Sequence, residues 1–158
     1  MQVVDAVHRL PTRGAVLAIG NFDGVHRGHR ALLRRMRAWA DEEGRSAAIV
    51  TFFPPAKVLF QGMSYLASHE EKLALLEPFA PDAVAMVRFD RDYARTDKSA
   101  FLAELAELAP RAIVVGEDFR FGRHRAGGLD DLQHVPERLE VFGLEHDGGA
   151  PVSSSRIR

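Results

Sequence analysis

The sequence predicts an α/β fold: a Rossmann-like, doubly wound parallel sheet of about five strands with flanking helices. Two observations lead to this prediction. First, five apolar segments, made mostly of branched or small residues, have the pattern of strands buried in a sheet: 15–19, 47–52, 83–89, 112–115 and 139–142. Second, segments with helical spacing or helix-capping residues lie between them, and strands that alternate with helices form parallel sheets.

The N-terminal third of the chain begins with residues 2–10, which fit an edge strand or an arm that Pro11 ends. After the strand at 15–19, apolar residues recur at helical spacing as far as Ala40, and Gly44 is a natural helix stop. The next strand leads into two prolines, which cannot continue a sheet ladder. A functional loop is therefore expected at residues 53–57.

The later elements are marked by their caps and stops. Ser-His-Glu-Glu at 68–71 is a capping box, which predicts a helix over 69–79 whose first turn, Lys72 included, is solvated. The run 90–94 predicts a polar loop. Thr96 or Asp97 is expected to cap the following helix, and a short helix is expected near 129–133.

Composition limits the class of protein. A chain of 158 residues with 46% hydrophobic and 27% charged residues is typical of one globular domain. The absence of cysteine excludes disulfides, thiolate catalysis and cysteine-ligated metals. A net charge of −1 argues against nonspecific nucleic-acid binding, and no apolar run approaches a membrane span. We therefore expect a cytoplasmic protein with neither a nucleic acid nor a membrane as partner, with positive charge concentrated locally at 120–125 and 156–158.

The most informative stretch is Gly-Asn-Phe-Asp-Gly-Val-His-Arg-Gly-His at 20–29, between the first buried strand and the first long helix. Glycines allow a sharp turn, and the amides at a helix N-terminus attract anions. His26 and His29 are three residues apart and share one face of the first helical turn, while Gly28 leaves room for a phosphate. Alone, such a pair is more often surface histidines or part of a metal site. Its context of strand, glycine turn and helix favours phosphate chemistry.

Two other loops are expected at the same edge of the sheet. The loop at 116–128 has four glycines and three arginines, and a connection of this length inside a domain usually binds something. In open α/β sheets, ligands lie beyond the carboxyl ends of the strands. Right-handed crossovers would bring the loops after residues 19, 52 and 115 to one crevice.

These residues resemble one family in particular. The order of strand, glycine turn, His-x-Gly-His and helix is typical of the nucleotidylyltransferase superfamily, and within it the chain resembles the adenylyltransferase (FAD synthetase) module of bacterial bifunctional riboflavin kinase/FMN adenylyltransferases. The matching motifs are the stretch at 20–29, Thr-Phe-x-Pro at 51–54, Leu-x-x-x-x-Glu-Lys at 66–72, Phe-x-x-x-Phe-Ala at 89–94 with Tyr93 for the second Phe, Val-Gly-x-Asp-Phe-x-Phe-Gly at 115–122, and a tail at 152–158 similar to Ile-Ser-Ser-Thr-x-Ile-Arg.

The resemblance implies that residues 1–158 form an FMN adenylyltransferase domain that makes FAD and pyrophosphate from ATP and FMN, with Mg²⁺ accompanying ATP and no protein-only metal site. It implies catalytic roles for His26, His29 and Arg158. The residues implied in ATP binding are Gly20, Asn21, Phe22, Asp23, Gly28, Ser154, Ser155 and Arg156. Those implied on the flavin side are Phe52, Pro54, Asp118 and Phe119.

Two departures from the family and two alternatives stay open. Pro54-Pro55-Ala56 lacks the family's usual second proline two residues after the first, which predicts a reshaped flavin loop. The sequence ends where the family continues with a helix and a riboflavin kinase domain, so kinase activity is expected of a separate domain or protein. The alternatives are another phosphorylated acceptor, such as nicotinamide mononucleotide or phosphopantetheine, and a noncatalytic nucleotide- or flavin-binding module.

Overall fold

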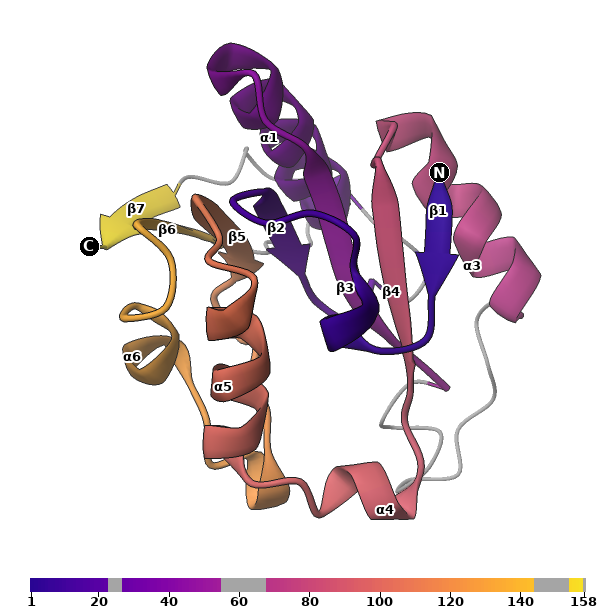
Figure 1. Cartoon of the computed structure of the whole chain (residues 1–158), viewed down its shortest axis with the longest axis vertical. Coiled ribbons are helices and arrows are strands. Elements are labelled where there is room, and N and C mark those ends of the chain that lie inside the picture. The colour runs from indigo at the N-terminus through magenta and orange to yellow at the C-terminus, as the bar shows by residue number, and fades with distance from the viewer. Residues whose placement is uncertain (23–26, 55–67, 144–153, 158) are drawn as a thin grey trace.

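The computed structural model describes residues 1–22, 27–54, 68–143 and 154–157, the last of these by backbone alone. Within these ranges the strands form one seven-stranded sheet, shown in Figure 1. In sheet order the strands are β1 Gln2–Val4, β4 Ala83–Arg88, β3 Ala47–Phe53, β2 Val16–Ile19, β5 Ala112–Gly116, β6 Arg138–Phe142 and β7 Ser154–Ile157. Six of these strands run parallel, and β7 pairs antiparallel with β6.

The predicted parallel α/β sheet is therefore confirmed, and two strands extend it beyond the expected five. Residues 2–4 form the edge strand that was one of the two options for the N-terminus. Residues 154–157 form β7 at the other edge, where the sequence indicated only a polar tail. A polar edge strand is held by backbone pairing to its neighbour, so it leaves no apolar pattern to read.

Helices cover both faces of the sheet (Figure 1). The α-helices within the described residues are α1 Arg27–Glu43, α3 His69–Leu76, α4 Arg91–Ala94, α5 Lys98–Glu107 and α6 Leu129–Leu132. The 3-10 turns are η1 Val7–Arg9, η2 Glu77–Phe79 and η3 Arg123–Arg125. The two apolar cores share the strands: one lies under α1 and α3, the other under η1, α5 and α6.

Alternation along each strand assigns its side chains to these two cores. Leu17 and Ile19 of β2 face α5, whereas Val16 and Ala18 face α1. All four are buried, as expected for a central strand in a parallel sheet. This explains why the sequence of β2 reads as a continuous apolar run.

Three local predictions need correction. The run 90–94 contains the helical turn α4, which Asp90 caps by accepting a hydrogen bond from Tyr93 N at 2.8 Å. The helix expected over 69–79 is α-helical only to Leu76 and ends as η2, because Pro78 has no amide hydrogen for the helix ladder. The prediction that the first turn of α3 is solvated is wrong for Lys72, which is only 2% exposed.

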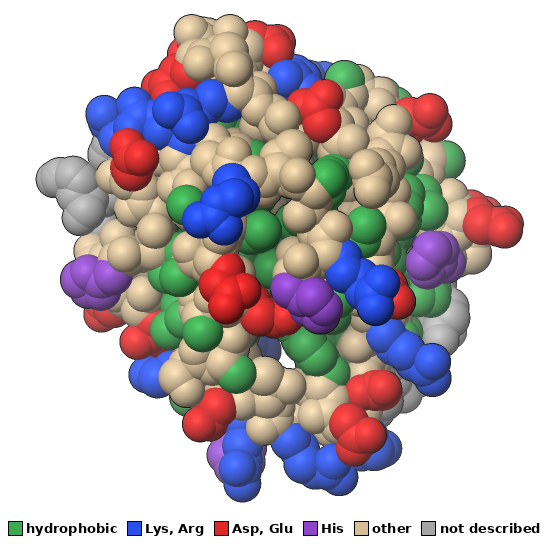
Figure 2. Space-filling model, in the orientation of Figure 1, with side chains coloured by type: hydrophobic (Ala, Val, Ile, Leu, Met, Phe, Trp, Pro, Cys, Tyr) green, Lys and Arg blue, Asp and Glu red, His purple; other side chains and the backbone are tan. Residues whose placement is uncertain are grey.

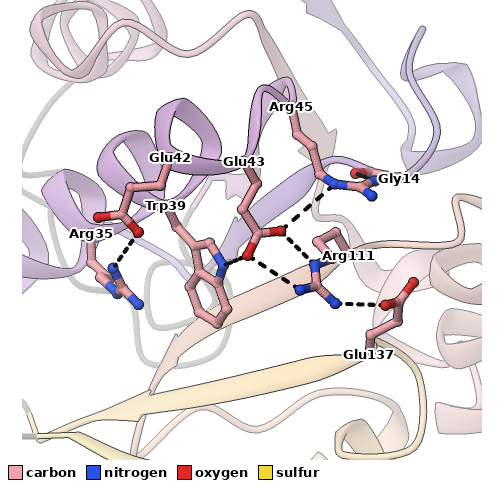
Figure 3. Close-up of polar contacts among 8 residues, drawn as sticks. All are labelled: Gly14, Arg35, Trp39, Glu42, Glu43, Arg45, Arg111 and Glu137. Carbon is pink, nitrogen blue, oxygen red and sulfur yellow. Dashed lines mark hydrogen bonds and ion pairs between the residues drawn. The ribbon is translucent and has the colours of Figure 1, made fainter.

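A cluster of charges anchors the C-terminal end of α1 at the amino edge of the sheet, the edge at which the strands begin (Figure 3). Glu43 accepts hydrogen bonds from Trp39 Nε1 at 3.0 Å and from Arg111 Nε at 2.5 Å. Arg111 also reaches Glu137 at 2.6 Å. Because Arg111 directly precedes β5, these contacts tie α1 to the sheet and fix the direction in which its N-terminus points.

This cluster predicts an acid-dependent loss of stability. The hydrogen bonds from Arg111 and Trp39 lower the pKa of Glu43 from 4.5 to about 2. A carboxyl group with a depressed pKa stabilises the fold above its unfolded pKa, and the contribution disappears as the pH falls through the folded pKa. We expect Glu43→Gln to lower the free energy of urea unfolding at pH 7, and the difference from the unsubstituted protein to shrink between about pH 4.5 and 2.

The neighbouring Glu42→Gln is the matched control for this experiment. Glu42 lies one residue away on the same helix, is 64% exposed, and reaches Arg35 only at 3.7 Å. Exposed ion pairs of this kind contribute little to stability. Equal losses for the two variants at pH 7 would contradict the role assigned to Glu43.

Candidate active site

The carboxyl ends of β3, β2 and β5 lie side by side at one edge of the sheet, as the crossover argument predicted. Ile19 pairs with Val50 on one side and with Val115 on the other, all in parallel register. The chain passes from β2 to β3 in one direction and places β5 on the opposite side of β2. In doubly wound sheets this reversal opens the crevice that holds a ligand.

The turn after β2 is tightly held. Gly20 N donates to Val50 O at 3.1 Å, and the hydroxyl of Thr51 donates to Asn21 O at 3.0 Å. Phe22 adopts a left-handed backbone with φ 47° and folds its buried ring over Gly20, where an added Cβ would lie 3.1 Å from the ring. Phe22 therefore offers a ligand only its backbone, while Asn21 has an exposed side chain.

The N-terminus of α1 follows this turn and carries one of the predicted histidines. Arg27, Gly28 and His29 form the first turn, with Gly28 buried and His29 half-buried. The His29 ring meets the Phe22 ring edge-on, with centroids 5.2 Å apart and planes at 81°. His29 is thus oriented from beneath by an aromatic side chain of the same turn. Asp23 and His26, which the sequence also predicts for this site, lie outside the described residues.

The four residues implied on the flavin side differ in exposure. Pro54 is half-buried and Asp118 is exposed, so both present side-chain surface at the carboxyl edge. Phe52 is 5% exposed and Phe119 is 7% exposed, and both belong to the core that packs under α5. Each therefore supports the edge from below. Pro55 and Ala56, where the sequence departs from the family, lie outside the described residues.

Phe52 and Phe119 belong to an aromatic cluster beneath the loops. The Phe52 centroid lies 6.2 Å from those of Phe89, Tyr93 and Phe101. Phe121 joins the cluster through Phe101 at 5.1 Å and stacks on Phe119 at 5.8 Å. Burial raises the pKa of the Tyr93 hydroxyl, which stays neutral. The cluster gives the end of β3, the segment after β4 and the loop after β5 one shared apolar floor.

The loop after β5 is ordered by backbone contacts. Phe121 and Gly127 form an antiparallel bridge, and Arg123 N donates to Thr96 O at 2.8 Å. Between these contacts the loop exposes Arg123, His124 and Arg125. Within the part of the chain that the structure describes, the two arginine side chains have no acidic partner within salt-bridge distance.

Figure 2 shows this edge in space-filling form, at the bottom of the view, where α4 and the start of α5 lie in Figure 1. The surface is hollowed there, and Lys and Arg side chains lie below the hollow on both sides, with Asp and Glu side chains beside them. The α4 side contributes Arg88, Arg91 and Arg95, all exposed. Asp90 and Asp92 pair with Arg88 at 3.7 Å and with Arg95 at 2.8 Å, which offsets part of the positive charge on this side.

The predicted serine and arginine residues of the tail are placed by β7. Ser154 pairs with Phe142 at the carboxyl end of β6, Ser155 pairs with Val141, and Arg156 pairs with Glu140. Ser154 thus starts at the carboxyl edge, and the chain then runs back toward the amino edge. Two strands, β5 and β6, separate β7 from β2, and Arg158 lies outside the described residues.

Two polar residues near the turn were not singled out for the site from the sequence. Thr51 is fully buried and holds the Asn21 carbonyl. Lys72 donates from Nζ to Phe52 O at 2.8 Å. A buried lysine has the same sequence signal as a solvated one, so only the Glu-Lys motif marked the position.

Neither a metal centre nor a membrane helix is found in the described parts of the chain. No group of three or more His, Asp or Glu side chains in these ranges is arranged to hold a metal ion. None of the helices described here has the length and apolarity that a membrane crossing requires.

Comparison with solved structures supports the fold. A protein titled macrolide-efflux protein from Streptococcus pneumoniae superposes with a TM-score of 0.77, covering 93% of this chain and 52% of that one at 19% identity. At this identity the likeness concerns the fold alone.

Comparison of sequences identifies the family. The family model for FAD synthetase matches residues 9–156. A Geobacillus thermodenitrificans relative, whose name joins riboflavin kinase and FMN adenylyltransferase, is 39% identical across all of this chain and 88% of that protein. The bifunctional riboflavin kinase/FMN adenylyltransferase of Escherichia coli is 34% identical, and that of Pseudomonas fluorescens is 36% identical; the chain spans 54% of each. This chain therefore belongs to the FAD synthetase family.

Proposed function

We propose that this chain transfers the AMP moiety of ATP to FMN in the cytoplasm, making FAD and pyrophosphate. One observation carries the proposal: the tightly held turn after β2 leads into the N-terminus of α1, whose first turn carries His29 against the Phe22 ring, beside the point at which the sheet changes direction. At a helix start, the direction of the backbone amides and the helix dipole favour phosphate binding. Because the chain belongs to the FAD synthetase family, we infer that the bound phosphates are those of ATP and FMN.

In the proposed reaction, a 5′-phosphate oxygen of FMN attacks the α-phosphorus of ATP. The new bond joins this oxygen to the α-phosphorus, and the bond from the α-phosphorus to the bridging oxygen breaks, so pyrophosphate leaves with both electrons of that bond. No covalent enzyme intermediate is needed. The protein must align two polyanions and stabilise the charge that develops between them.

The roles of individual residues follow this division of work. His26 and His29, with the amides at the start of α1, would hold the α-phosphoryl group as it becomes five-coordinate. Arg158 and the tail residues Ser154, Ser155 and Arg156 would hold the departing pyrophosphate. Mg²⁺ would accompany the triphosphate and neutralise part of its charge. FMN would come from a riboflavin kinase in a separate domain or protein.

The flavin is proposed to lie over the aromatic floor between the loops after β3 and β5. Pro54 and Asp118 present surface there, and the basic residues around η3 offset the charge of the phosphates. Apolar slots with a few polar groups are typical of such ligand sites.

The test is to incubate the protein with Mg²⁺, ATP and either FMN or riboflavin, and to separate the flavins by chromatography. FAD formed from FMN and none from riboflavin is the expected result. ATP binding by calorimetry without FAD formation would contradict FMN as the acceptor. The same assay with nicotinamide mononucleotide or phosphopantetheine would then identify another acceptor, and no product with any of them would indicate a noncatalytic module.

A further inference from the structure

We propose that Lys72 is a positioning residue that holds the carboxyl end of β3 and, through β3, the turn after β2. The inference rests on the proposed function for its kinetic consequences. Its structural part, the order of the turn, stands without it.

The first observation is the burial of a charged side chain. Lys72 is 2% exposed and lies on α3, which packs on the same face of the sheet as α1. Its ammonium group lies 2.8 Å from the carbonyl oxygen of Phe52. Removing an ammonium group from water is costly unless hydrogen bonds replace its hydration. The position therefore uses a charge where an apolar residue would pack more cheaply.

The second observation explains which backbone group the ammonium satisfies. Carbonyl groups alternate in direction along a strand: Val50 O accepts from Gly20 N, the residue just after β2, and Phe53 O accepts from Phe89 N, the residue just after β4. The carbonyl of Phe52 therefore points toward β2. The strand β2 has already ended at Ile19, so the sheet provides no amide for this carbonyl, and Lys72 Nζ donates to it instead.

The third observation connects this carbonyl to the candidate site. Thr51, the residue before Phe52, donates its hydroxyl to Asn21 O and so fixes the turn after β2. On the other side of Phe52, the Phe53 ring meets the His69 ring of α3 edge-on at 5.4 Å. One helix, α3, thus anchors the end of β3 at a carbonyl and at a ring. The end of β3 in turn anchors the turn that leads to His29.

The consequence is a path by which α3 sets the position of the phosphate-binding turn without touching a ligand. A small displacement of reacting groups can lower a rate by about 100-fold. We expect Lys72→Met, which keeps the apolar stem and removes the donor, to lower kcat for FAD formation by about 10- to 100-fold. The KM for FMN should change less than kcat, because the turn is proposed to act on the reacting phosphates.

The experiment compares Lys72→Met with Leu76→Val and adds hydrogen exchange as a readout independent of activity. Leu76 lies one turn further along α3, is fully buried and packs in the core under α1, so its truncation loosens the same helix without removing a polar contact. We expect faster amide exchange at residues 20–22 in Lys72→Met alone. Leu76→Val should lower the melting temperature and leave kcat within about threefold of the original value.

Several results would overturn the inference. One is unchanged exchange at residues 20–22 in folded Lys72→Met; another is an equal fall of kcat in Leu76→Val at the same loss of stability. If Lys72→Met does not fold, Thr51→Val takes its place, because it removes the hydroxyl donor to Asn21 and keeps the shape of the side chain. Unchanged amide exchange at residues 20–22 in Thr51→Val would refute the proposal that β3 positions the turn after β2. Absence of FAD formation by the unsubstituted protein would refute the proposed function alone, since exchange still tests the role of Lys72.

Discussion

Replacing His29 with alanine is expected to lower kcat for FAD formation by about 100-fold or more, which is the cost of losing one donor aimed at a transition state. The imidazole is half-buried in the first turn of α1 and is oriented by the Phe22 ring. The fold should survive, because the aromatic contact contributes only about 0.5–1.5 kcal/mol. Steady-state kinetics together with a thermal melt measures both effects.

A second histidine gives the control. His134 is exposed and lies between α6 and β6, on the path back to the amino edge of the sheet. His134→Ala should keep wild-type kcat and KM. FAD synthesis by His29→Ala at the rate of the His134→Ala control would refute the role proposed for the turn after β2.

The largest expected loss of stability comes from replacing Gly122 with alanine. Gly122 has φ +80°, and an added Cβ would lie 2.8 Å from Lys98 Cα and 2.9 Å from Lys98 N. At φ +80° and ψ 173° the backbone lies in a region essentially confined to glycine, which costs about 1–3 kcal/mol for alanine. The clash adds about 1–3 kcal/mol, because α5 cannot move away without displacing the buried Phe101. Urea unfolding at pH 7 measures the total.

Gly44→Ala is a comparison at a positive φ without a clash. Gly44 has φ +64° at the end of α1, and no atom lies within 4 Å of the position of its added Cβ. It therefore carries the backbone strain without the clash. We expect Gly122→Ala to lose clearly more stability than Gly44→Ala, and equal losses would mean that the contact between the loop and α5 relaxes freely.

The Gly122 variant also connects stability with function. The bridge between Phe121 and Gly127 and the hydrogen bond from Arg123 to Thr96 place the exposed basic residues of the loop at the carboxyl edge. A displaced loop would move these charges and loosen the stacked aromatic floor below them. Loss of stability should therefore be accompanied by a higher KM for FMN.

The sequence by itself determined the elements whose signal is local. The apolar run of β2, the helical spacing of α1 and the capping box at Ser68 predicted a strand and two helices, because burial, periodicity and caps act over a few residues. Alternation of these elements then determined the parallel order of the sheet. The motif at 20–29 predicted where the sheet would carry its site, and Gly20 and His29 lie at that edge.

The tertiary structure decided the features that depend on which distant groups pack against or pair with a residue. A lysine in the first turn of a helix is normally solvated. Lys72 is buried, and it donates to the Phe52 carbonyl, which β2 leaves without a partner because β2 ends opposite Val50 while β3 continues to Phe53. The polar tail is a strand because β6 offers it an edge. Phe52 and Phe119 carry the motifs of a binding loop, yet their rings support that loop from the core. Backbone groups that need partners, and the space left between packed layers, are properties of the folded chain, and no window of sequence contains them.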